Sequence, residues 1–441
     1  MTVVLRRRFG VWAALAMIVA EVMGVGVFLT PAGMARTLGD TGWVIGVWAL
    51  MGLLSVAGAL VYAELGTRFP EAGGGYVYLR EAFGERTAFL FGWMSLLVMD
   101  PGITAALGVG LAKYLIFLVG GSPTLIPGVA IASIIGLSAL SMLGVKSSAR
   151  LLRWTAVAKL VAVSVLILAA VMNRDGAAAD PRAYVAAPNM SVLVGAFMGA
   201  FFAFGGWWDL GKMNEEIVEP RRTLPIALVG GILVVTLVYA SVSLAFIHVM
   251  RGPQSETDEA AVAALGSTLF GAGADKLLAA AVVIAVAGSL AAVLLGAPRV
   301  YLAMARSGVF PKGLVNFDSK RQAAPPATLI QVGLACLLVL LGNFDQILGY
   351  FVPATVAFLG LSASAILILP RPAADADVFR APLHPLPILL FLVLVIVIVG
   401  LFAMGRPLST LAGAAVIALG IPVSYVVLKR PGQPVKSEST P

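Results

Sequence analysis

The sequence predicts an all-α polytopic membrane protein of twelve spans, two of them broken near the middle. Of its 441 residues, 60% are hydrophobic and 12% charged, and the mean hydropathy is +0.98. These values lie far outside the range of soluble domains. Apolar runs of about 20 residues, the length that crosses a bilayer, recur along the whole chain. Glycines interrupt one such run in each half, at Gly24 and Gly26 and at Gly205 and Gly206.

The first run follows three arginines, but no small-residue cleavage pattern closes it, so we interpret it as a span rather than a signal peptide. No long soluble domain remains between the runs. We expect the spans roughly at 10–36, 42–68, 86–118, 123–144, 151–172, 191–218, 223–250, 275–305, 326–342, 346–369, 385–404 and 408–428.

Lysine and arginine in the loops predict the orientation. With the N-terminus inside, the cytoplasmic segments hold 21 of the 30 basic residues, Lys212 among them, and the outer loops hold 5. Both termini are therefore predicted to be cytoplasmic. The net charge of +8 then reflects topology in the bilayer, and we expect no nucleic-acid partner.

The single cysteine, Cys336, lies within a predicted span. No internal disulfide is possible, and no outer-loop thiol is available to hold a disulfide-linked ancillary subunit. We interpret Cys336 as a small core residue.

The two broken runs are related by position. Their centres near Gly24 and Gly205 are about 181 residues apart, and so are the starts of the runs that follow, near Gly42 and Thr223. This spacing is typical of inverted five-plus-five repeats, whose paired breaks lie at a transport site.

The residues at the breaks predict what binds there. Gly24 and Gly26 allow close ligand approach, and the helix that restarts at Val27 presents free N–H groups at its positive end, which suit a carboxylate. Phe202 to Gly205 would end a helix with unpaired carbonyls, which suit an ammonium group. Together the breaks suit a zwitterion such as a free amino acid. The alternative is that these glycines serve only close helix packing.

Several motifs resemble those of the amino acid, polyamine and organocation transporter superfamily, and in particular its L-type amino-acid transporter branch. They run in family order over about 300 residues. They are Glu21 to Pro31 (EVMGVGVFLTP), Phe202 to Trp207 (FAFGGW) with Glu215-Glu216 and Pro220 to Pro225, Tyr62 to Gly66, Gly73 to Tyr78, Ala112 to Tyr114, Ala158 to Leu160, and Ala305 to Gly308 with Phe310-Pro311.

The resemblance implies the leucine-transporter fold, with ten core helices in two inverted repeats, helices 1 and 6 unwound, and two peripheral helices. The expected layout is a cytoplasmic N-terminus at 1–9, a core at 10–370 with repeats at about 10–172 and 191–370, peripheral helices at 371–430 and a disordered cytoplasmic tail at 431–441.

Carried over by position, the resemblance also implies the binding residues. The N–H groups of Val25 and Gly26 would hold the substrate carboxylate, and the carbonyls of Val22, Phe202 and Gly205 the amino group. Phe202 and Trp207 would close over the substrate. The whole expected set is Val22, Met23, Gly24, Val25, Gly26, Phe202, Ala203, Phe204, Gly205, Trp207 and Trp208.

Two residues depart from the family pattern. Val25 replaces a small hydroxyl residue, which removes a side-chain donor but leaves the backbone contacts. Trp208 stands where relatives often place a small polar residue, and its bulk favours a smaller substrate.

Lys159 lies midway along a predicted span, where an ammonium costs about 2.5–3.5 kcal/mol on insertion scales. The resemblance places it against the unwound first helix, where sodium-coupled relatives bind a cation. A tethered ammonium would replace sodium, whereas the structural alternative is snorkelling to the interface. The eighth run offers only Ser289 as a central hydroxyl ligand. We therefore expect sodium-independent transport and no metal or cofactor.

Glu21 and Asp100 are carboxylates within predicted spans, where each is costly unless paired or protonated. Either one titrates during transport, neutralises a cationic substrate or is a satisfied group of the bundle interior. A Glu21–Lys159 pair is one arrangement considered. Glu64, Glu215 and Glu216 lie near cytoplasmic helix ends, where pairing with Arg68, Arg221 or Arg222 would stabilise a closed inner gate.

Three hypotheses follow. The first is a sodium-independent exchanger or facilitator of small to medium neutral L-amino acids, working by alternating access in a bacterial inner membrane. The second is a proton-coupled carrier of cationic amino acids or polyamines that uses Glu21 and Asp100. The third, an enzyme or channel, lacks support because the sequence contains no phosphate loop and no histidine or cysteine cluster at mid-depth.

Overall fold

The computed structural model describes residues 7–428 except 25, 39, 143–144, 174–187, 250–257, 272, 311–324 and 374–375. The first half comprises α1 (Val11–Val22), α2 (Gly26–Leu38), α3 (Thr41–Arg68), α4 (Gly75–Phe83), α5 (Glu85–Met94), a π-helical turn η1 (Ser95–Met99), α6 (Asp100–Val119), a 3-10 turn η2 (Pro123–Leu125), α7 (Ile126–Met142) and α8 (Val145–Met172).

The second half repeats the theme of a broken helix followed by long ones. It comprises α9 (Met190–Ala203), a 3-10 segment η4 (Trp207–Glu216), α10 (Pro220–Val249), α11 (Asp258–Phe270), α12 (Ala274–Gly296), α13 (Pro298–Arg306), α14 (Pro325–Leu341), α15 (Phe344–Ile368), α16 (Leu386–Gly405) and α17 (Pro407–Leu428).

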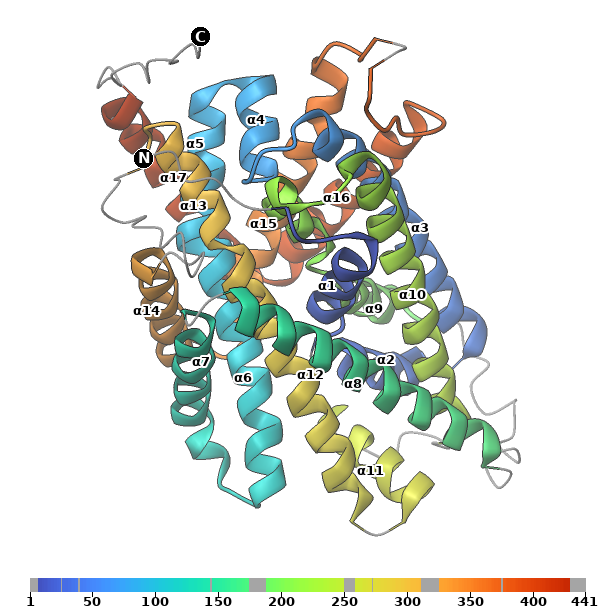
Figure 1. The fold of residues 1–441 in the computed structure, drawn as a ribbon. Helices are drawn as coiled ribbons and strands as arrows, with labels where there is room; N and C mark the ends of the chain where they lie inside the picture. Colours follow the sequence, from blue (N-terminus) through green and yellow to red (C-terminus); the bar gives the residue numbers. More distant parts are fainter. Residues whose placement is uncertain are drawn as a thin grey trace.

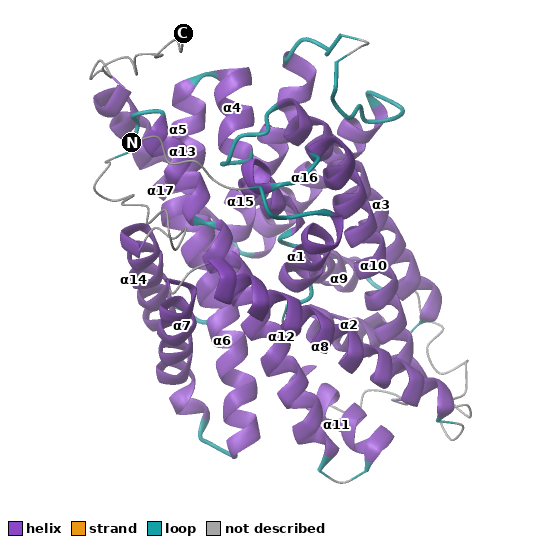
Figure 2. Ribbon diagram, viewed as in Figure 1, coloured by secondary structure: helices purple, strands orange, loops and turns teal. Residues whose placement is uncertain are grey.

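The helices account for all twelve predicted spans (Figures 1 and 2). Within the described residues, ten are long and apolar enough to cross a bilayer. The eleventh crossing is the first run, which α1 and α2 share, and the twelfth is α14 with 17 residues. The described chain is helical, as predicted, and has the leucine-transporter fold. Because the number of crossings is even, α1 begins and α17 ends toward one face (Figure 1), which we call the terminal face.

Both predicted breaks are confirmed. Helix α1 ends at Val22 and α2 begins at Gly26, while α9 ends at Ala203 and the chain turns through Gly206 before η4. Gly206 has φ +116°, a conformation that favours glycine because it has no Cβ. The two breaks touch, since a Cβ on Gly26 would lie 2.8 Å from the Cα of Ala203.

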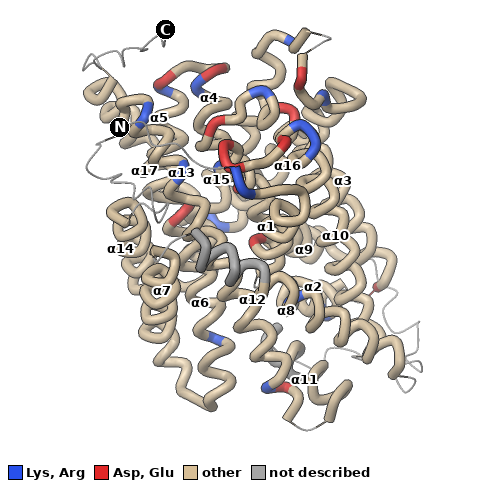
Figure 3. Tube along the Cα trace, viewed as in Figure 1, with Lys and Arg blue, Asp and Glu red and all other residues tan. Residues whose placement is uncertain are grey.

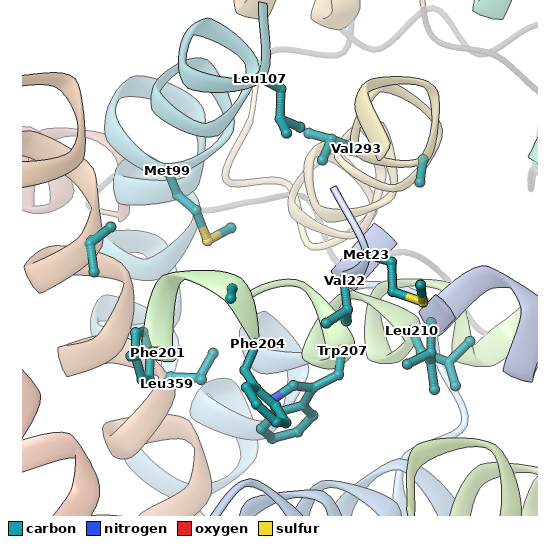
Figure 4. Close-up of a cluster of buried hydrophobic side chains, with 14 of the residues drawn as sticks. Val22, Met23, Met99, Leu107, Phe201, Phe204, Trp207, Leu210, Val293 and Leu359 are labelled. Atoms are coloured by element: carbon teal, nitrogen blue, oxygen red, sulfur yellow. The ribbon is translucent and has the colours of Figure 1, made fainter. Parts of the chain in front are cut away.

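Apolar packing around the breaks holds the broken ends in place. Figure 4 shows Val22, Met23, Phe204 and Trp207 within one cluster of buried apolar side chains. Charged residues gather instead toward the terminal face, around α4 and the loops beside it (Figure 3). The charged residues buried near the breaks, such as Glu21 and Asp209, stand apart from these.

Candidate functional site

A small cavity, of about 40 Å³, lies where the two breaks meet. Seven of the residues predicted for the site or its coupling line it. They are Glu21, Val22, Gly24, Gly26, Phe202, Gly205 and Trp208. The cavity is therefore built by the ends of α1 and α9 and the start of α2.

Four other predicted residues are not part of the cavity wall that the structure describes. Met23, Ala203, Phe204 and Trp207 are buried in the surrounding apolar cluster. Trp207, predicted to gate, packs with its ring centroid 5.4 Å from that of Tyr62. Val25 lies outside the described residues.

The remaining wall residues were not among those predicted; they lie on α6, on α15 and in the last turn of α9. These residues are Ile103, Leu107, Phe201, Phe351, Val352, Thr355 and Val356. Thr355 is the polar member, and its buried hydroxyl has no hydrogen-bond partner among the residues that the structure describes. The sequence did contain a signal for Thr355, which lies midway along an apolar run. A hydroxyl buried there needs a hydrogen-bond partner, which a substrate can provide.

The backbone groups of the breaks are unequally available. The Val22 carbonyl accepts hydrogen bonds from Gly24 N at 2.8 Å and from the Tyr239 hydroxyl at 2.9 Å. The Phe202 carbonyl accepts one from Gly205 N at 3.1 Å. None of the hydrogen bonds among the described residues ends on the Gly205 carbonyl. In this state the Gly205 carbonyl is therefore the most available of these three acceptors, and the first N–H groups of α2 belong to a helix start, which provides them with no carbonyl partner within the helix.

Lys159 of α8 reaches the first break from outside the cavity. Its buried ammonium donates to the carbonyl of Ala20, in the last turn of α1, and to the Ser289 hydroxyl of α12 at 3.0 Å. Ser289 in turn donates to the same carbonyl at 2.6 Å. The salt bridges of the described residues do not include the Glu21–Lys159 pair that the sequence suggested. Lys159 binds the backbone next to Glu21 instead.

Asp100 lies in a buried charge cluster rather than on the cavity wall. Its carboxylate accepts from Lys212 Nζ at 3.1 Å and from the Tyr301 hydroxyl at 2.6 Å, and Lys212 also donates to Asp209 at 2.9 Å. The assignment of Lys212 to a cytoplasmic loop was wrong, because η4 folds back into the protein and leaves this side chain 2% exposed. Asp209 was missed for the same reason: local sequence does not reveal which side a 3-10 segment buries.

A second, larger cavity of about 600 Å³ leads from the site toward the face opposite the terminal face. It is lined by α2, the first turns of α9 and the end of α16, and Gly26 and Phe202 line both cavities. We call it the vestibule. The Phe202 ring packs edge-on against that of Phe344, with centroids 5.9 Å apart. Phe202 therefore stands between the site and the vestibule.

The terminal face is closed beneath the site. The backbone before α1 pairs with the end of η4, since Phe9 N donates to Glu216 O at 3.0 Å and Val218 N to Phe9 O at 2.9 Å. Such bonds join the two broken segments directly. Reopening this face requires them to separate.

Ion pairs reinforce this closure. The predicted Glu64–Arg68 pair forms, but the partners predicted for the other two glutamates were wrong. Glu215 pairs with Arg306, and Glu216, fully buried, pairs with Arg299 at 3.1 Å. Because both arginines come from α13, the closure ties η4 to a distant segment of the chain.

Comparisons with known proteins agree with this geometry. The amino acid permease family model matches residues 9–426. The serine/threonine exchanger of Bacillus subtilis is 29% identical over 97% of this chain and 98% of its own length. The human cystine/glutamate transporter is 26% identical over 96% of this chain and 86% of its own. The mouse large neutral amino acids transporter small subunit 2 is 26% identical over 96% and 81%.

These relatives are membrane transporters and not enzymes, as predicted. With a family model that matches nearly the whole chain, and with two broken helices that meet at a cavity, the chain belongs to the amino acid permease family.

Proposed function

We propose that this chain is a sodium-independent transporter of small to medium neutral L-amino acids, an exchanger or facilitator that works by alternating access. The observation that carries the proposal is the meeting of the two breaks at one cavity. The N–H groups at the start of α2 and the Gly205 carbonyl would hold the two poles of the amino acid. The Trp208 indole on the cavity wall supports a small side chain.

Sodium independence rests on Lys159. Its ammonium engages the Ala20 carbonyl and the Ser289 hydroxyl, and these are the oxygen ligands that a sodium ion would need at the first break. The tethered ammonium of Lys159 would then occupy permanently the place that a bound sodium ion takes in a sodium-coupled carrier.

The alternating-access mechanism is supported by the asymmetry of the two faces. The site communicates with the vestibule past Phe202, whereas backbone bonds and buried ion pairs close the terminal face. We assign this arrangement to the outward-open state, with both termini cytoplasmic in a bacterial inner membrane. The inward-open state would require η4 and α1 to part at the terminal face.

The rival hypothesis, a carrier of cationic amino acids or polyamines, is less well supported. Among the described residues that line the vestibule, the charged ones are Arg36, Lys113 and Arg406, all basic. A cationic solute would have to pass them. Asp100, moreover, already binds Lys212 and Tyr301.

Reconstitution of the full chain in liposomes tests the proposal. Counterflow of labelled serine is measured against unlabelled alanine, serine, leucine, arginine and putrescine, with sodium or choline as the cation. We expect neutral amino acids to compete, arginine and putrescine to compete weakly, and choline to change nothing. Loss of uptake in choline would overturn sodium independence, and competition only by the cationic solutes would favour the rival.

A further inference from the structure

Within the described residues, five carboxyl and ammonium side chains are buried around the first break and the helices that pack on it. Glu21, Asp100, Lys159, Asp209 and Lys212 are each at most 6% exposed. With every group ionised, three carboxylates and two ammonium groups leave a net charge of −1. Uncompensated charge at this depth is costly. One additional proton makes the cluster neutral.

The hydrogen bonds show where that proton is needed. Lys212 donates to Asp100 Oδ1 at 3.1 Å and to Asp209 Oδ2 at 2.9 Å, and the Tyr301 hydroxyl donates to Asp100 Oδ2 at 2.6 Å. Asp100 is therefore satisfied on both oxygens. Among these five residues, the buried carboxylate atoms without a hydrogen-bond partner in the described part of the chain are Glu21 Oε1 and Asp209 Oδ1.

These two orphan oxygens belong to neighbouring carboxyl groups. Glu21 packs on Gly206, where a Cβ would lie 2.8 Å from Glu21 Cγ, and Asp209 follows Gly206 by less than one turn. Two carboxylates have no hydrogen to share, so they repel unless one of them is protonated.

Glu21 also faces the substrate. It lines the central cavity, whereas Asp209 lines a smaller cavity of about 10 Å³ beyond it, and both cavities share Trp208 and Thr355. The other charges around Glu21 are Lys159 from α8, Lys212 from η4 and Asp100 from α6.

We propose that Glu21 and Asp209 hold one proton between them, and that the arriving amino group of the substrate releases it. This inference rests on the proposed function. In the empty site the Glu21 O–H donates to Asp209 Oδ1, which satisfies both orphan oxygens. When the substrate ammonium approaches Glu21, its positive charge balances the net negative charge of the cluster, so that the shared proton is no longer needed. The O–H bond breaks, and the proton leaves to water in the vestibule.

A proton that must leave makes binding dependent on pH. Where Glu21 is protonated in the empty site, the apparent affinity falls about tenfold for each unit by which the pH is lowered, because one proton is exchanged per substrate. The same linkage couples substrate movement to the proton gradient.

Calorimetry of L-serine binding to the full chain in detergent measures the exchanged proton directly. Titrations at one pH in phosphate and in Tris, whose ionisation enthalpies differ, give the number of protons released. We expect about one per serine. Glu21→Gln should bind serine and release none, because its amide donates to Asp209 Oδ1 as the protonated acid does. Asp209→Asn, which gives the same pairing from the other side, should also release none.

Glu215→Gln is the matched control, since Glu215 lies on η4 as Asp209 does but pairs with Arg306. This variant should release as many protons per serine as the wild type. Thermal unfolding identifies variants that fail to fold. Wild-type protein that binds serine without releasing a proton, or Glu21→Gln and Asp209→Asn variants that still release one, would overturn the inference while leaving the proposed function intact. Failure of the wild type to bind serine, or any neutral amino acid selected by counterflow, would overturn both.

Discussion

Replacement of Gly26 by alanine tests whether the two breaks form one site. The new Cβ would lie 2.8 Å from the Cα and 2.9 Å from the Cβ of Ala203. Carbon atoms pack at about 3.5–4.0 Å, so the ends of α2 and α9 must separate by roughly 1 Å. Overpacking of this kind costs about 1–3 kcal/mol. If the closed, substrate-bound state bears that cost, the apparent affinity falls about 5- to 150-fold, since about 1.4 kcal/mol is a factor of ten.

Serine counterflow and thermal unfolding of the reconstituted chain measure the effect. Gly136→Ala is the control, because on α7 its Cβ meets nothing within 4 Å, and it should match or exceed the wild type in stability. Ala203→Gly combined with Gly26→Ala should recover part of the loss, since it removes one of the two clashing atoms. Wild-type affinity and stability in Gly26→Ala would refute the direct contact between the breaks.

Three further variants probe the cation, the closed face and the gate. Lys159→Ala removes a charged donor that binds two acceptors. The loss of about 1.5–3 kcal/mol of hydrogen-bond energy should lower the initial rate of uptake about 10- to 150-fold. An unchanged rate of uptake would contradict this. Glu216→Gln leaves the buried Arg299 charge uncompensated, which costs about 3–5 kcal/mol, so the melting temperature should drop sharply. A melting curve identical to wild type would show that the Glu216–Arg299 pair does not stabilise the closed terminal face. Phe202→Ala widens the passage between the site and the vestibule, and we expect a KM for serine at least about tenfold higher at similar stability, whereas Phe202→Tyr should stay near wild type. Equal KM values for the two variants would show that the ring does not gate.

Much of the architecture follows from local properties of the chain. The length of an apolar run predicts a crossing, because every backbone group in lipid must be bonded within the segment. The glycines at 24, 26, 205 and 206 predicted both breaks; in the structure Gly206 accepts φ +116° and Gly26 allows close contact with Ala203. Lys159 drew attention for a related reason: an ammonium at mid-depth needs a partner.

The partners of the buried charges did not follow from the sequence. Lys212 was counted with the basic residues of the cytoplasmic segments, yet η4 buries it between Asp100 and Asp209. Glu216 was expected to pair with a nearby arginine and instead binds Arg299 on α13. Thr355 entered the site from α15, a span with no motif assigned to it.

The sequence by itself determined the number of crossings, the positions of the two breaks and the kind of solute they suit, because each depends on residues adjacent in the chain. Only the tertiary structure decided which segments pair at the terminal face, which residues form the cavity wall and which partners the buried charges bind. Those features depend on distances between segments more than 100 residues apart, as in the bond of Lys212 to Asp100, and no local pattern encodes them.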